Sequence, residues 1–418
     1  MIHRCTPVTR PFSASVQVPG SKSVANRALV CAALSVGESV LENIPNGDDT
    51  EAMLAGLTAL GIDVERAGSQ VTIRRNGPLQ AAEINAALAG TTSRFLAAVA
   101  ATAKNEIVLD GHERLRNRPF GPLIEALRSL GATVHDENGG LPLRIQGPLR
   151  GGEIEIDATM SSQFISALMM IAPVLHDGLC IGLRGELVSR PYVDLTAAVM
   201  ESFGVATIVS DSEIRIAEQT YQPTSLFVEP DASSASYPLA IAAVTGSTVT
   251  IEGFGASSRQ GDARISEILK LMGASVVVSV DSTELSGSSS RRLRGIDINM
   301  SDISDLVPTV AVLATFASSA TRIRGVGFIR KKESDRIGDL ARELKKCGAN
   351  IIEHADGLEI SPGQLHGSVL ETYEDHRLAM AFAILGSRVP GVEIRDPKVV
   401  TKSWPSFWSV LDGLVKPE

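Results

Sequence analysis

The chain has 418 residues, a hydrophobic content of 44% and a formal net charge of −9. This length predicts two or three domains, and the apolar content is sufficient for packed cores. An acidic chain with 4% aromatic residues lacks the basic, base-stacking surface that nucleic-acid or membrane binding requires. We therefore expect neither partner, and a local cluster of cations must attract any anionic ligand.

Targeting and redox signals are also informative. The N-terminal MIHRCTPVTRPF has no apolar signal region, and the longest strongly apolar run, 164–175, is too short to span a bilayer. Cys5, Cys31, Cys180 and Cys347 lack zinc-ligand spacing. The sequence therefore predicts reduced cysteines, a cytoplasmic location and no metal, with Cys347 in the core.

The first predicted elements set a pattern for the whole chain. A turn at 19–23 leads into an apolar, buried helix that begins near Lys22 and runs to Leu34. A short strand at 39–42 and a second helix capped by 48–50 follow, and Gly61 ends that helix before a hairpin. This βαβαββ unit is the predicted repeat.

Two series of helix starts repeat this unit six times, at intervals of 68 to 72 residues. The first series is Ser23, Thr91, Ser161, Ser233, Asp305 and Asp375, and the second is Asp48, Arg118, Arg190, Asp262, Lys332 and Lys402. The glycines that end the second helices are Gly61, Gly131, Gly204, Gly273 and Gly348. Six α/β units favour two domains of three units each.

The sixth unit lacks a hairpin, because the chain ends soon after Leu414. The segment before Pro19 is the natural donor of a completing strand, so we expect the N-terminus to join the C-terminal domain. The predicted domains are 21–228 for repeats one to three, and 1–20 with 229–418 for repeats four to six.

Helix N-termini bind anions through free N–H groups and the positive end of the helix dipole. Lys22 and Arg27 lie within about one turn of each other and can both reach a phosphate. Gly90 allows close backbone approach to a ligand, and Arg94 either binds ligand or holds the fold. A cation such as Arg118 at a helix start favours an incoming anion.

The later repeats add neutral donors and carboxylates. Ser161, Ser162 and Gln163 either cap a helix or donate to phosphate and hydroxyl groups. Asp305 is either a plain helix cap or the available base in a cationic site. Lys332 and Arg336 are expected on one helical face beside Glu333, as ligand-binding groups or as surface ion pairs.

The predicted cations come from both domains and are Lys22, Arg27, Arg118, Lys332, Arg336, Arg377 and Lys402. The carboxylates in the same phase are Asp305 and Glu333. Many cations with few carboxylates suit two anionic substrates and acid–base chemistry, without a metal or cofactor.

Ten segments in order resemble the EPSP synthase (3-phosphoshikimate 1-carboxyvinyltransferase) family: PGSKSVANRAL, LAGTTSRF, RNRPFGPLIEAL, MSSQFISAL, VSRPYVDLT, DASSASYPLA, SDISDLVPT, RKKESDRI, YEDHRLAMA and TKSWPSFW. The resemblance implies an α/β fold of two inverse α/β barrel-like domains, each of three βαβαββ repeats, with the active site in the interdomain cleft. It also implies that the protein transfers the enolpyruvyl group of phosphoenolpyruvate to shikimate 3-phosphate and that glyphosate targets it.

The same resemblance implies site roles. Residues matching the shikimate 3-phosphate contacts are Lys22, Ser23, Arg27, Ser161, Ser162, Gln163, Ser189, Asp305 and Lys332. Residues matching the phosphoenolpyruvate contacts are Lys22, Gly90, Arg118, Gln163, Arg336, Arg377 and Lys402. Catalysis is assigned to Asp305 as base on the 5-hydroxyl, Glu333 as proton donor and acceptor, and Lys22. We expect a monomer with small anionic substrates as its partners.

Three positions depart from the pattern of many family members: Leu88 and Phe95, which flank the phosphoenolpyruvate pocket, and Phe328. One rival function is the related transferase acting on UDP-N-acetylglucosamine, but its family carries a reactive cysteine in repeat two, where this chain has none. A non-catalytic anion-binding relative is a second rival, and the presence of both Asp305 and Glu333 argues against it.

Overall fold

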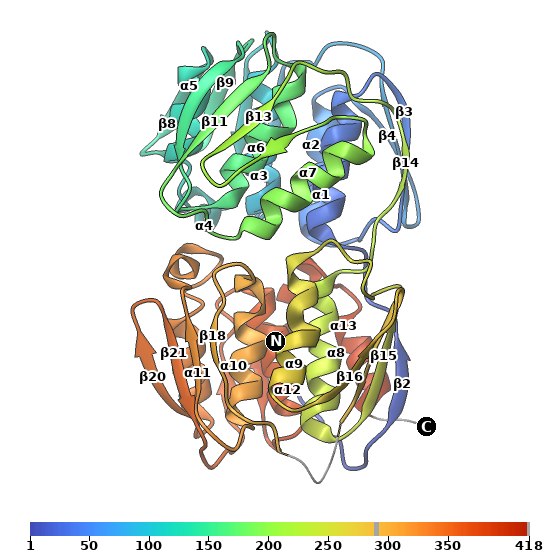
Figure 1. The fold of residues 1–418 in the computed structure, drawn as a ribbon, viewed down its shortest axis with the longest axis vertical. Coiled ribbons are helices and arrows are strands. Elements are labelled where there is room, and N and C mark those ends of the chain that lie inside the picture. Colours follow the sequence, from blue (N-terminus) through green and yellow to red (C-terminus); the bar gives the residue numbers. More distant parts are fainter. Residues whose placement is uncertain (288–291, 416–418) are drawn as a thin grey trace. The chain divides into compact units, whose positions relative to one another are not determined.

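The computed structural model describes residues 1–287 and 292–415, which divide into two compact units. Unit 1 contains residues 1–19 and 229–418, and unit 2 contains residues 20–228. Within each unit, small mixed sheets flank a bundle of helices (Figure 1). The predicted mixed α/β fold is confirmed.

The helices of unit 2 are α1 (Lys22–Leu34), α2 (Asp48–Ala59), α3 (Gly90–Ala101), α4 (Glu113–Arg116), α5 (Gly121–Ser129), α6 (Ser162–Ile171), the short 3-10 turn η1 (Ala172–Val174) and α7 (Arg190–Ser202). Its strands are β3 (Gly37–Glu42), β4 (Asp63–Ala67), β5 (Gln70–Arg75), β6 (Ala82–Asn85), β7 (Ile107–Asp110), β8 (Thr133–Glu137), β9 (Gly140–Gln146), β10 (Gly152–Asp157), β11 (Leu179–Arg184), β12 (Ile208–Val209), β13 (Glu213–Ile216) and β14 (Ser225–Phe227).

The helices of unit 1 are α8 (Ala232–Thr245), α9 (Ile265–Leu271), α10 (Val307–Thr315), α11 (Gly338–Lys346), α12 (His376–Gly386) and α13 (Phe407–Val415). Its 3-10 turns are η2 (Gly261–Arg264), η3 (Ser304–Leu306), η4 (Gly327–Lys331) and η5 (Pro397–Lys402). Its strands are β1 (Ile2–Arg4), β2 (Ser13–Val16), β15 (Thr248–Glu252), β16 (Ser275–Val278), β17 (Ser282–Ser286), β18 (Asp297–Asn299), β19 (Thr321–Arg324), β20 (Asn350–His354), β21 (Gly357–Ser361), β22 (Val369–Leu370) and β23 (Glu393–Arg395).

Among the described residues, five sheets have four strands in the same order and a sixth has three. In the second repeat, for example, β6 pairs with β7 in parallel, β7 pairs with β9 antiparallel, and β9 pairs with β8 antiparallel. The two segments that link the units also supply a parallel edge strand, as β6 does in the second repeat. β14 is the parallel partner of β3 in unit 2, and β2 is the parallel partner of β15 in unit 1.

The N-terminal segment completes the sixth sheet, as predicted. β1 pairs antiparallel with β23, which in turn pairs in parallel with β22. β1 therefore takes the place of the hairpin strand that the sixth repeat lacks.

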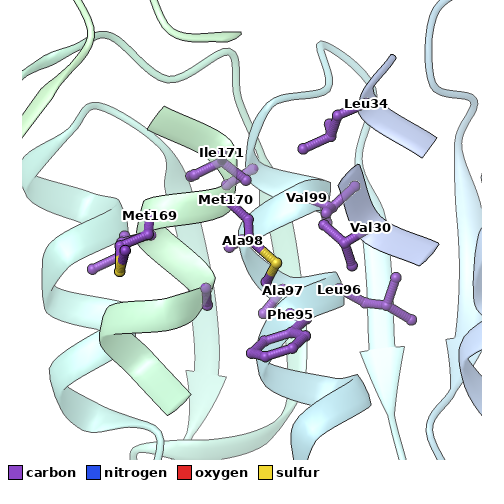
Figure 2. Packing of buried hydrophobic residues seen from close by; sticks show 14 of the residues in the cluster. Val30, Leu34, Phe95, Leu96, Ala97, Ala98, Val99, Met169, Met170 and Ile171 are labelled. Atoms are coloured by element: carbon purple, nitrogen blue, oxygen red, sulfur yellow. The ribbon is translucent and has the colours of Figure 1, made fainter. Parts of the chain in front are cut away.

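The core of unit 2 forms where α1, α3 and α6 pack together, and Figure 2 shows apolar side chains of these helices, from Val30 to Ile171, gathered there. These helices are apolar on nearly all sides, which is the pattern of a helix surrounded by others. The predicted helix ends are confirmed by Gly61, whose φ of +84° is left-handed, and by the corresponding glycines of the next repeats. Cys347 is fully buried, as predicted.

Candidate active site

Three carboxylates and two arginines of unit 1 form one connected network around Arg336, which is 1% exposed. Its guanidinium donates to Asp375 through Nε (2.7 Å), to Asp305 through Nη1 (2.9 Å) and to Glu333 through Nη2 (2.7 Å). Arg377 donates a further bond from Nη2 to Asp305 Oδ2 (2.7 Å). We call Asp305, Glu333, Arg336, Asp375 and Arg377 the unit 1 cluster.

Local backbone structure places these side chains. Asp305 lies in the short turn η3 that leads into α10, and Asp375 caps α12 by accepting from the Arg377 N–H (2.9 Å). The predicted helix start at Lys332 is wrong, because α11 begins at Gly338. Arg336 therefore contacts its partners from an irregular segment that precedes the helix.

Opposite charges set the protonation states of the cluster. Burial disfavours the charged form of Asp305, but Arg377, Arg336 and Lys332 outweigh it and hold the pKa of Asp305 below its usual range. Burial likewise opposes the charge of Arg336, yet the neighbouring carboxylates raise its pKa above the usual value. Asp305 is thus a carboxylate whose charge is held by two arginines.

Two lysines border the unit 1 cluster. Lys402, at the end of η5, is 6% exposed, and its Nζ lies 3.8 Å from Glu333 Oε1. Lys332 Nζ lies 5.9 Å from the ring centroid of Phe328, one of the departures from the family pattern. The aromatic face attracts the ammonium group there.

In unit 2, the predicted lysine at the start of α1 forms a shielded ion pair. Lys22 Nζ lies 2.9 Å from Oδ2 of Asp49, which is 3% exposed in the first turn of α2. The sequence predicted Asp49 only as part of a cap, but the structural cap of α2 is Gly47, which has no side chain. Asp49 instead fixes the position of Lys22.

Gly90 lies against two arginines. A β-carbon at this position would lie 2.3 Å from Arg118 Nη1 and 2.8 Å from Arg94 Nη1, so only glycine fits this arrangement. Arg94 Nη1 and Nη2 donate to the carbonyls of Gly90 (2.8 Å) and Pro119 (3.1 Å), which favours its role in holding the fold. The predicted helix start at Arg118 is wrong by three residues, because α5 begins at Gly121.

Repeat three supplies a row of polar groups. Ser161 caps α6 as predicted, its hydroxyl accepting from the Gln163 N–H (3.3 Å), and Gln163 Nε2 donates to Thr91 Oγ1 (3.2 Å). Ser162 is 5% exposed and Ser23 is half-buried. Ser189 directly precedes α7 at its N-cap position with a left-handed φ of +55°, a costly conformation for a residue other than glycine.

Arg27, in α1, and Arg190, at the start of α7, have opposite environments. Arg27 is 2% exposed, and every hydrogen bond that it makes lies inside unit 2. Burial lowers the pKa of Arg27 to about 10, which leaves it charged at neutral pH. Arg190 lies at the surface and pairs with Asp194 (3.0 Å) and Asp211 (2.9 Å).

Sequence reasoning missed two buried carboxylates, Asp49 and Asp375, as partners of site cations. The signal for Asp375 was present, because it occupies the same phase of the repeat as Asp305. In the described part of the chain, His, Cys, Asp and Glu side chains form no group of three suited to a metal ion. No helix among the described residues is long and apolar enough to cross a membrane.

Comparisons with known proteins identify the family. The model of the family described as EPSP synthase (3-phosphoshikimate 1-carboxyvinyltransferase) matches residues 8–411. A 3-phosphoshikimate 1-carboxyvinyltransferase of Nostoc punctiforme is 42% identical over 413 residues, covering 96% of both chains. One from Serratia proteamaculans is 40% identical over 411 residues, covering 95% of both.

Solved structures give the same result. An EPSP synthase of Acinetobacter baumannii superposes with a TM-score of 0.81 at 26% identity, covering 98% of this chain and 97% of that one. The enolpyruvyl transferase NikO of Streptomyces tendae has a TM-score of 0.78 over 99% and 97% of the two chains, but its 17% identity supports the fold alone. The resemblance read from the sequence is confirmed.

Proposed function

Because the chain belongs to the EPSP synthase family, we propose that it transfers the enolpyruvyl group of phosphoenolpyruvate to the 5-hydroxyl of shikimate 3-phosphate. The products are 5-enolpyruvylshikimate 3-phosphate and phosphate. The observation that carries the proposal is the unit 1 cluster, in which one carboxylate, Asp305, is held by two arginines that can also bind anions.

Asp305 acts as the general base on the 5-hydroxyl. Arg336 and Arg377 stabilise its charge and make it a weak base. Anionic substrate groups that bind these arginines compete for the same N–H donors. Asp305 then loses part of that stabilisation, and its affinity for the hydroxyl proton rises when substrate is present.

Glu333 supplies and later removes the proton at the enolpyruvyl methylene carbon. Its Oε2 is 2.7 Å from Arg336 Nη2 and its Oε1 is 3.8 Å from Lys402 Nζ, so both oxygens lie near cations. Protonation at the methylene carbon lets the 5-oxygen bond to the neighbouring carbon and form a tetrahedral intermediate. Return of that proton to Glu333 breaks the bond between the carbon and the phosphate oxygen, and the departing phosphate takes up the proton that Asp305 accepted from the 5-hydroxyl.

The remaining residues bind and orient the two anions. The shikimate 3-phosphate contacts are assigned to Lys22, Ser23, Arg27, Ser161, Ser162, Gln163, Ser189, Asp305 and Lys332. The phosphoenolpyruvate contacts are assigned to Lys22, Gly90, Arg118, Gln163, Arg336, Arg377 and Lys402. The Lys22–Asp49 ion pair, 2.9 Å long, supports the assignment of Lys22 because it gives the flexible side chain a fixed position.

The domain of residues 21–228 is proposed as the shikimate 3-phosphate side, and the chain is proposed to act as a cytoplasmic monomer. The test of function is phosphate release from phosphoenolpyruvate with shikimate 3-phosphate or UDP-N-acetylglucosamine as acceptor. We expect release and an enolpyruvyl product with shikimate 3-phosphate only. Turnover with UDP-N-acetylglucosamine but not with shikimate 3-phosphate would contradict the proposal. So would the absence of turnover with both acceptors.

A further inference from the structure

Arg27 is held by a buried pair of hydroxyl groups that come from two other helices. Its Nε donates to Thr196 Oγ1 of α7 (2.7 Å), and its Nη2 donates to Ser166 Oγ of α6 (3.1 Å). Nη2 also donates to the Tyr192 carbonyl (3.2 Å), and Nη1 donates to the Ser23 carbonyl (2.8 Å). Ser166 and Thr196 are both fully buried.

The hydrogen-bond directions within this pair are determined by counting protons. Thr196 Oγ1 donates its single proton to the Tyr192 carbonyl (2.7 Å). The 2.7 Å bond between the two hydroxyls must therefore be donated by Ser166. Both oxygens then have lone pairs directed at Arg27, so neither hydroxyl can rotate away without losing a buried hydrogen bond.

The guanidinium has five N–H groups in a fixed plane. Nε uses one, Nη2 uses two, and Nη1 uses one for the Ser23 carbonyl. Within the described residues, the second hydrogen of Nη1 has no acceptor among these bonds. The plane is fixed further by the rings of Phe95 and Tyr192, whose centroids lie 5.3 and 5.8 Å from Arg27 Cζ.

We propose that Ser166 and Thr196 are positioning residues that orient Arg27 so that one Nη1–H is presented to a single oxygen of shikimate 3-phosphate. This inference rests on the proposed function and refines it. Arg27 is then a one-bond donor and not a bidentate phosphate clamp, because its other N–H groups are already used. The hydroxyls act through Arg27 and do not touch substrate.

Kinetics of two matched variants test this role. Thr196→Val keeps the side-chain shape but leaves the Arg27 Nε–H without its acceptor, and Ser166→Ala removes the second hydroxyl. Each should raise the KM for shikimate 3-phosphate about tenfold, a typical effect of leaving a buried donor unsatisfied. The KM for phosphoenolpyruvate and kcat should stay within about twofold, and Thr196→Ser should restore the wild-type KM.

The control is Thr315→Val in unit 1. Thr315 is 4% exposed, and its hydroxyl donates to the Val312 carbonyl (2.7 Å), so the change is chemically the same but lies in the other unit. Equal KM effects in Thr315→Val and Thr196→Val would overturn the proposal, since general destabilisation would explain both. Unchanged shikimate 3-phosphate KM in both Thr196→Val and Ser166→Ala would also overturn it.

A second measurement does not depend on turnover. In protein labelled with ¹⁵N-arginine, the Arg27 Nε–H signal is identified by its loss in Arg27→Lys. Thr196→Val should shift this signal and speed its exchange with water, whereas Thr315→Val should leave it unchanged. An unaltered signal in Thr196→Val would overturn the positioning role. If wild-type protein shows the expected signal but does not use shikimate 3-phosphate, the proposed function fails, and the substrate part of this inference fails with it.

Discussion

Gly90→Ala should displace Arg118 and weaken phosphoenolpyruvate binding. The added β-carbon would lie 2.3 Å from Arg118 Nη1 and 2.7 Å from its Cζ. Carbon and nitrogen atoms do not approach closer than about 3.4 Å without repulsion, so one partner must move by about 1 Å. Arg118 is closer to the added β-carbon than Arg94, whose Nη1 lies 2.8 Å away, so Arg118 takes most of the displacement.

A misplacement of about 1 Å in a substrate-positioning group can cost about 10²-fold in rate. We therefore expect the KM for phosphoenolpyruvate to rise by roughly 10- to 100-fold in Gly90→Ala, with a smaller change in kcat. The assay is initial-rate phosphate release with phosphoenolpyruvate varied at saturating shikimate 3-phosphate. Gly121→Ala is the matched control, because a β-carbon there meets no atom within 4 Å.

Glyphosate gives a second readout of the same site. It should compete with phosphoenolpyruvate in the wild type, because the cationic residues attract small anions by charge. As the longer molecule, it should lose more affinity than phosphoenolpyruvate in Gly90→Ala. A wild-type KM for phosphoenolpyruvate in Gly90→Ala would refute the reasoning about Arg118. If wild type were already insensitive to glyphosate, the departures Leu88 and Phe95 would be the next positions to change.

Three further outcomes are expected. Asp305→Ala should lower kcat by about 10²- to 10⁴-fold, while calorimetry should still detect binding of shikimate 3-phosphate. Activity of this variant within a factor of about three of wild type would exclude Asp305 as the base. Asp375→Ala should lower the free energy of unfolding by about 3–5 kcal/mol, because buried Arg336 loses a carboxylate partner. An unchanged denaturant concentration at the midpoint of unfolding would contradict this expectation. Burial, followed by the charge of Asp305, raises the pKa of Asp262 to about 7. The folded state therefore holds this proton more tightly than the unfolded state, and stability should fall as pH rises from about 4 to about 7. That slope should be smaller in Asp262→Asn, and an identical slope in both proteins would show that Asp262 does not cause it.

The sequence by itself determined the repeat and several of the residues that begin and end its helices, although the predicted helix starts at Arg118, Lys332 and Lys402 were wrong, since the helices there begin at Gly121, Gly338 and Phe407. Lys22 begins α1 and Ser161 caps α6, and Gly61 ends α2 in the left-handed conformation, all as predicted. These features depend on neighbours a few residues away, since caps and helix stops are local hydrogen-bonding problems.

The tertiary structure decided which partners the charged side chains have. Lys332 to Arg336 were expected in a helix, but Arg336 lies in an irregular segment before α11, where it pairs with Asp305 and Asp375 from distant segments as well as with nearby Glu333. Arg27 depends on hydroxyls 139 and 169 residues away. Local propensity contains no information about such pairs, because burying a guanidinium is favourable only where distant acceptors meet it. The sequence therefore determined the repeat and several of its helix caps and stops, whereas three-dimensional packing determined the ion pairs and hydrogen bonds of the site.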